Sequence, residues 1–250
     1  MKMTLLDMVQ DILNDMDGDE VGSISDTVES EQVAQIIKTT YFAIISNRNW
    51  PHLRKTIKFT SLYDLDRPTY LRSPTGLTEL VFINYNNINQ DGRSVYESLS
   101  WLEPDEFLRK ANSLNTTDDN VKVVSDFSGV KFAIRTDTKP VYYTSFDDEY
   151  IVLDAYDKNL EDTVQESKVQ ALGYMSPTWQ MSDSFVPDLP DEAFIALLEK
   201  SKSRASLKLR QVADQLSEQE GMRQQRWLSR KAWKVDGGIK YPNYGRTSRK

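Results

Sequence analysis

The sequence contains no cysteine and a single histidine, His52, among its 250 residues. The absence of cysteine excludes disulfides, thiol nucleophiles and every cysteine-ligated zinc or iron–sulfur site. A single histidine excludes multi-histidine metal sites, and any catalytic triad would have to use His52. No apolar run reaches the about 18 residues that suggest a membrane span. Because Asp7 interrupts the start too early for a signal peptide, we expect the protein to stay where it is made.

Sequence motifs for catalysis and cofactor binding are also missing. Neither a P-loop, nor G-x-G-x-x-G, nor the G-x-S-x-G nucleophile elbow is present. Asp15, Asp17 and Asp19 match the first three ligand positions of a calcium-binding EF-hand loop, but Glu20 and Asp26 stand where glycine and glutamate are required. We therefore predict an acidic loop here, a packing or surface role for His52, no metal or cofactor, and no enzymatic activity.

Charge is divided unevenly along the chain. Residues 1–199 hold 17 Lys and Arg against 34 Asp and Glu, whereas residues 200–250 hold 14 against 4. The chain is also polar, with 39% apolar residues and a mean hydropathy of −0.57. These values favour either an elongated protein or polar contacts between subunits. The basic C-terminal part could bind nucleic acid, an acidic partner or the acidic body of another copy.

Periodicity predicts helices at both ends of the chain. Apolar residues at helical spacing predict one helix over residues 4–16 and a second that starts at an N-cap, Ser30, and stops before Trp50-Pro51. A further helical stripe begins after residue 190, breaks near 213–221 and resumes over 222–234. Residues 235–250 are too rich in glycine and too poor in apolar residues to fold alone.

The middle of the chain has the composition of β-structure. β-rich runs predict strands near 57–62, 78–85, 121–127, 130–136, 141–146 and 150–156, with hairpin turns at Ser128-Gly129 and Asp147-Asp148. Pro104 and the acids around it predict one short helix over 103–110. We therefore predict an α+β fold in which the terminal helices (1–54 and 188–234) form one bundle, residues 55–187 form an inserted antiparallel β-rich module, and 235–250 form an extended tail.

The last predicted helix carries an unusual mixture of side chains. Arg223, Arg226 and Arg230 surround Trp227 at helical spacing, and Trp233, Tyr241 and Tyr244 follow. Tryptophan, tyrosine and arginine dominate binding hot spots. The alternative is that both tryptophans pack on the protein's own bundle. If the surface binds a partner, either single-stranded nucleic acid or a protein suits it, and the acidic body favours a protein.

Several segments resemble one known family in pattern and order. They are Ser23–Tyr41 followed by Trp50-Pro51, Leu102–Leu108 (LEPDEFL), Leu189–Phe194 (LPDEAF), Trp227–Trp233 (WLSRKAW) and Gly237–Arg246 (GGIKYPNYGR). Together they resemble the head-to-tail adaptor, or connector, proteins of tailed bacteriophages, the group that includes tail-tubular-protein-A-like proteins.

The resemblance implies a structural virion protein at the head–tail interface. Such adaptors form a ring, usually of twelve copies, below the portal protein; they extend the channel for double-stranded DNA without reading its sequence, and they carry the tail or nozzle. They act without catalysis, cofactor or membrane. An acidic body suits a channel wall, since like charge keeps DNA from sticking. Portal docking would fall on Arg223, Arg226, Trp227, Arg230, Trp233, Ile239, Tyr241, Tyr244 and Arg246. A nucleic-acid-binding protein that uses the basic C-terminal region is the alternative.

Overall fold

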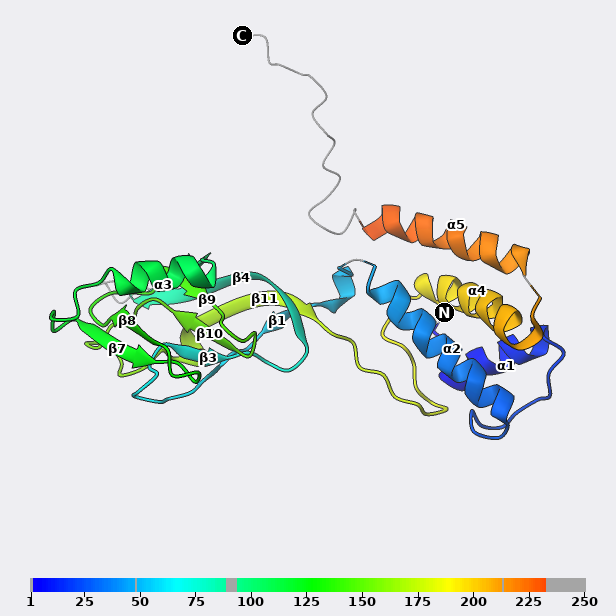
Figure 1. Cartoon of the computed structure of the whole chain (residues 1–250). Coiled ribbons are helices and arrows are strands. Elements are labelled where there is room, and N and C mark those ends of the chain that lie inside the picture. Colours follow the sequence, from blue (N-terminus) through cyan, green and yellow to red (C-terminus); the bar gives the residue numbers. More distant parts are fainter. Residues whose placement is uncertain (1, 48, 89–93, 213, 233–250) are drawn as a thin grey trace, which may run out of the picture. The chain divides into compact units, whose positions relative to one another are not determined.

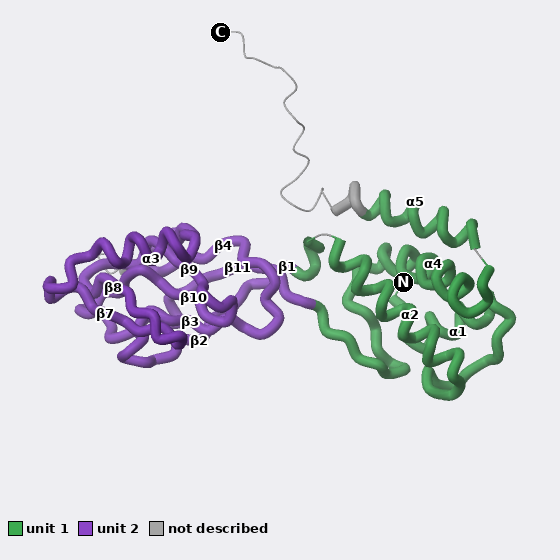
Figure 2. Tube along the Cα trace, in the orientation of Figure 1, with its two compact units in different colours: residues 1–53, 177–250 green, residues 54–176 purple. Residues whose placement is uncertain are grey.

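The chain has a mixed α+β fold that divides into two compact units (Figures 1 and 2). The computed structural model describes residues 2–47, 49–88, 94–212 and 214–232. Unit 1 consists of residues 1–53 and 177–250, and unit 2 consists of residues 54–176. The two ends of the chain therefore share one unit, and the middle forms the other.

Unit 1 contains the four long helices. They are α1 (Leu5–Asp15), α2 (Val28–Ile45), α4 (Ala193–Ala205) and α5 (Gln215–Ala232). Helices α1, α2 and α4 pack against one another, and α5 packs against α4 (Figure 1). None of the helices among the described residues has the length and hydropathy that a bilayer crossing needs.

The N-terminal helices begin with reciprocal capping hydrogen bonds. Thr4 and Asp7 cap α1, which confirms the helix predicted over 4–16. The predicted cap of α2 is wrong: Thr27 is its N-cap, and Ser30 is the third helical residue, whose hydroxyl accepts a hydrogen bond from the Thr27 amide. Helix α2 ends at Ile45, before Trp50-Pro51 as predicted, and the Trp50 indole donates to the carbonyl of Ile44 at 3.2 Å.

The C-terminal helices differ from the prediction at their junction. Helix α4 continues as a π-helical turn, η3 (Ser206–Arg210), and ends at Gln211, whose left-handed backbone has φ 57°. Helix α5 then begins at Gln215, where the Asp214 carboxylate accepts from the amides of Leu216 and Ser217. The predicted break over 213–221 is therefore wrong for most of its length, because Asp214 caps the helix and Gly221 is tolerated inside it.

Segment 177–187 belongs to unit 1, although residues 55–187 were predicted as one module. The Asp183 carboxylate accepts a hydrogen bond from the Ile24 amide at 2.8 Å, and its backbone carbonyl accepts from the Leu6 amide at 3.2 Å. These bonds attach the segment to the loop before α2 and to α1. The amphipathic pattern could not show them, because the segment has no regular structure.

The described residues of unit 2 form two sheets, a β-hairpin, one α-helix and the short 3-10 helix η2 (Glu166–Lys168). The first sheet is antiparallel and has the order β1 (Arg54–Ile57), β11 (Val169–Met175), β4 (Leu77–Ile88) and β5 (Ser94–Ser98). The second has the order β2 (Thr60–Ser61), β3 (Tyr70–Arg72), β10 (Tyr150–Leu153), β9 (Tyr142–Thr144) and β6 (Ser100–Trp101). Strands β6 and β9 are parallel, so the prediction of a purely antiparallel module is wrong at this pair. Strands β7 (Val121–Ser125) and β8 (Lys131–Arg135) form the hairpin.

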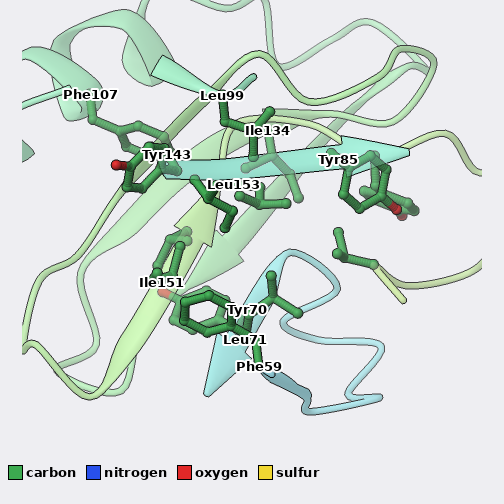
Figure 3. Close-up of a cluster of buried hydrophobic side chains, with 14 of the residues drawn as sticks. Phe59, Tyr70, Leu71, Tyr85, Leu99, Phe107, Ile134, Tyr143, Ile151 and Leu153 are labelled. Atoms are coloured by element: carbon green, nitrogen blue, oxygen red, sulfur yellow. The ribbon is translucent and has the colours of Figure 1, made fainter. Parts of the chain in front are cut away.

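One apolar core joins these elements. Helix α3 (Pro104–Asn112), predicted over 103–110, inserts Phe107 against Phe132 of β8, with ring centroids 5.9 Å apart. The core also takes Leu71 and Leu153 from the second sheet and Tyr85 from the first, as the close-up shows (Figure 3). Both predicted hairpin turns are confirmed: Gly129 (φ 87°) closes one, and Asp148 (φ 60°) lies in the other.

Candidate partner-binding surface

Helix α5 packs on α4 through very few apolar side chains. Its buried residues are Ser217, Gly221 and Leu228, which share one face of the helix. A Cβ atom at position 221 would lie 3.0 Å from Cγ of Lys200 on α4, so glycine here lets the two helices approach closely. Over residues 215–228, the part of α5 whose side chains the structure describes, Leu228 is the one large buried apolar side chain, so most of this part presents its surface outward.

A groove of about 840 Å³ opens between the first turn of α4 and the second half of α5. Trp227, with 47% of its surface exposed, shares the lining with the similarly exposed Ile195 and Met222. The full lining is Glu192, Ile195, Gln219, Met222, Arg223, Gln224, Arg226 and Trp227. Aromatic residues, methionine and arginine are enriched at protein interfaces, so this lining has the composition of a binding surface.

Two arginines border the apolar part of the groove. Arg223 lies 3.4 Å from Glu220, but its side chain is 80% exposed, so the pair adds little stability and leaves the cation accessible. Arg226 is exposed and forms no ion pair with any residue that the structure describes. The groove can therefore receive an apolar side chain flanked by acidic groups.

Lys200 lies half-buried between α4 and α5. Its ammonium group donates a hydrogen bond to the side-chain oxygen of Gln225. Burial lowers the pKa of Lys200, and the positive charge of Arg204 lowers it further. No carboxylate among the described residues forms an ion pair with this half-buried cation, so it contributes little to the contact between α4 and α5.

The structure brings three of the nine predicted docking residues together. Arg223, Arg226 and Trp227 all line the groove. Arg230 lies within α5, but its side chain is outside the described part of the structure. The remaining predicted residues lie outside the described residues; these are Trp233, Ile239, Tyr241, Tyr244 and Arg246.

The contribution of α4 and of Met222 to the groove was not predicted from the sequence. Ile195 falls off the apolar stripe that runs through Phe194 and Leu197, and it is half-exposed. An apolar residue outside the buried stripe of an amphipathic helix was the available signal. Ile195 shares the groove with Met222 because of the way α5 packs on α4. Periodicity in the sequence does not specify that packing.

Asp15, the first residue of the predicted acidic loop, lies at the end of α1, and both Asp15 and His52 have structural contacts. The ammonium group of Lys202 on α4 lies 2.9 Å from Asp11 and 2.6 Å from Asp15 on α1. In the described parts of the chain, no three acidic or histidine side chains gather closely enough to hold a metal ion. His52 lies in the short helix η1 (Pro51–Leu53), with its Nε2 2.9 Å from the carbonyl of Asp188 and its ring against Trp50.

Comparisons with known protein families and with curated proteins give no match for this chain. No model of a known protein family matches the chain, and no curated protein matches its sequence.

Proposed function

We propose that this chain is a structural protein of a tailed-bacteriophage virion, a head-to-tail adaptor that forms a ring below the portal, extends the DNA channel and provides the platform for the tail. In this proposal the helices from both ends of the chain act as one bundle that carries unit 2 as an insert. The C-terminal half of α5 and residues 235–250 dock on the portal protein.

The groove between α4 and α5 is the observation that carries the proposal. Trp227 and two arginines stand exposed on a helix that buries one large apolar side chain, Leu228, among its described side chains. Such an arrangement costs solubility unless another molecule covers it, and tryptophan with arginine is the usual composition of an interface hot spot. In this proposal the partner is the portal protein, because the segments that resemble connector proteins imply a portal partner.

Titratable groups with shifted pKa values serve the fold in ways consistent with an assembly role. Hydrogen bonds from Thr4 lower the pKa of Asp7 at the start of α1. Bonds from Ser217 and Leu216 lower the pKa of Asp214 at the start of α5. Burial raises the pKa of Tyr70, and its hydrogen bond to Asp126, 2.8 Å long, adds to the shift. Each shift belongs to a cap or to a core contact.

The test mixes the full-length chain with the portal protein of the same virus and measures co-sedimentation, with electron microscopy of the pelleted particles. We expect an added ring on the portal. Trp227→Ala should weaken binding by at least about tenfold, because it removes a hot-spot side chain. Trp101→Ala is the matched control, since Trp101 is 45% exposed and lies in unit 2; it should bind as the wild type does.

Deletion of residues 235–250 should leave the body folded and abolish portal attachment. Normal co-sedimentation of this truncated chain would refute the docking role of the tail, and no co-sedimentation of the intact chain would refute the adaptor proposal. Double-stranded and single-stranded DNA serve as competing ligands in filter binding. Tight binding of either near physiological salt, with a steep loss as salt rises, would favour the nucleic-acid-binding alternative.

A further inference from the structure

The most exposed large apolar side chains of the chain fall mainly in two places. Among the described residues the seven most exposed are Leu216 (82%), Val28, Val212 (62%), Leu65 (61%), Leu207 (59%), Tyr63 (56%) and Leu160. Five of these seven belong to two short segments. One segment joins α4 to α5 in unit 1, and the other joins β2 to β3 in unit 2.

The first segment, which we name the turn patch, consists of Leu207, Lys208, Val212 and Leu216. Its backbone departs from regular helix twice, through the π-helical turn η3 and through Gln211 in the left-handed region. Both features are uncommon and occur often at functional sites. Arg210 fixes the turn to the rest of unit 1 through the Met16 carbonyl and through Glu29, 3.1 Å away in each case. The turn patch is therefore fixed to the rest of unit 1, while its apolar side chains stay exposed to solvent.

The second segment, which we name the loop patch, consists of Tyr63, Leu65 and Asp66. Tyr63 also has a left-handed backbone, with φ 53°, which is rare for an aromatic residue. Asp64 accepts from the Asp66 amide at 2.8 Å and from Arg67 at 3.3 Å. Lys122 of β7 donates to the Leu65 carbonyl. This second strained turn is thus also fixed while it presents apolar side chains to solvent.

The two patches carry opposite charges at their centres. Lys208 is exposed in the turn patch, and Asp66 is exposed in the loop patch. Neither forms an ion pair with any residue that the structure describes. Each patch therefore offers the other an apolar surface and a counter-charge.

We propose that the turn patch of one copy of this chain docks on the loop patch of the next copy, with Lys208 against Asp66. Because the two patches differ, the contact is heterologous, and each copy keeps one free patch for a further copy. Repetition of such a contact closes into a ring when the rotation permits. The closure into a ring rests on the proposed adaptor function, whereas the pairing of the patches rests on the exposed residues themselves.

Charge reversal tests the contact in the full-length chain by sedimentation velocity over a range of protein concentrations. The wild type should associate as concentration rises. Lys208→Glu and Asp66→Lys should each weaken association by at least about tenfold, because like charges would then face each other. The double variant should recover it. An equimolar mixture of the two single variants should also associate, because every junction then joins Lys to Asp or Lys to Glu.

Lys131→Glu and Asp119→Lys are matched controls, since both residues are exposed in unit 2 outside the loop patch; they should associate like the wild type. Three results would overturn the proposal: a wild type that stays monomeric at its highest soluble concentration, single variants that associate normally, or a mixture that fails to associate.

Portal co-sedimentation of the same variants separates the two proposals. A chain that binds portal, but whose self-association does not depend on Lys208 and Asp66, loses this inference alone. A chain that self-associates as described without binding portal loses the adaptor function alone.

Discussion

Gly221 of α5 lies directly against Lys200 of α4, so that an added Cβ would stand 3.0 Å from the lysine Cγ. This contact determines how closely the two helices approach and therefore shapes the groove beside them. Lys200 can move when a single methyl group is added, but a long side chain has no room. The position is thus a sensitive test of how α5 is held.

Gly221→Leu should loosen α5 from α4. Overpacking a close contact costs about 1–3 kcal/mol, and the buried contribution of Leu228 is too small to hold the helix against it. Hydrogen exchange should therefore accelerate over residues 215–228 and stay unchanged over residues 54–176. Gln219→Leu adds the same side chain to the exposed side of α5 and should leave protection unchanged. Equal protection in the Gly221 variant would show that α5 is anchored by other contacts.

The start of α5 should lose stability at low pH. Hydrogen bonds from Ser217 and Leu216 lower the pKa of Asp214 below its ordinary value of 3.8. A group with a lowered pKa in the folded state contributes its full stability above pH 3.8 and loses it as pH falls through the folded value. Exchange at residues 215–218 should accelerate on acidification below about pH 4.

Asp214→Asn is the matched variant for this prediction, because asparagine caps helices well and carries no titrating charge. Its exchange over the first turn should respond less to acid than that of the wild type. The same acid response in both chains would assign the effect to other carboxylates.

Gly173→Ala should destabilise unit 2. A Cβ at this central position of β11 would contact Ile57 Cδ1 and lie 2.5 Å from the carbonyl oxygen of Glu79 on β4. The strand cannot retreat without breaking its ladder at the irregular register beside Leu172. We expect a loss of about 1–3 kcal/mol in chemical denaturation. Gly22→Ala, whose nearest new contact is the Asp26 carboxylate at 3.4 Å, should change the same measurement far less.

The same glycine explains why β11 was absent from the sequence analysis. Glycine weakens strand propensity, and Gln170 breaks the apolar pattern of Val169–Met175. What makes this segment a strand is its position between β1 and β4, which is a tertiary property. By contrast α1 and α3 carry their own start signals, in Thr4 with Asp7 and in Pro104, and both helices were predictable.

The candidate site was predictable on one helix only. Arg223, Arg226 and Trp227 lie one turn apart, so helical spacing alone places them together. Ile195 lies 32 positions before Trp227 in the chain. It reaches the same groove because α4 and α5 pack antiparallel, and no local sequence pattern encodes that packing. The start of α5 was predicted too late, because Asp214 caps the helix and Gly221 lies inside it.

Lys202 should matter to unit 1 because it joins the first and the last third of the chain. Its side chain is only 14% exposed, and it binds Asp11 and Asp15 together. Burial lowers the pKa of Lys202, but the hydrogen bonds that its ammonium group donates to these two carboxylates outweigh burial and raise the pKa above its ordinary value. Lys202→Met keeps most of the side-chain volume and removes the charge, which leaves two carboxylates close together without their cation. We expect unit 1 to lose about 1 kcal/mol in chemical denaturation at low salt, and less at high salt, because salt screens the remaining repulsion.

Arg109→Met removes an exposed cation that is paired with Asp105 at 3.4 Å and should change stability by only a few tenths of a kcal/mol. An equal effect of the two variants would show that the contact between α1 and α4 depends on apolar packing rather than on this paired charge.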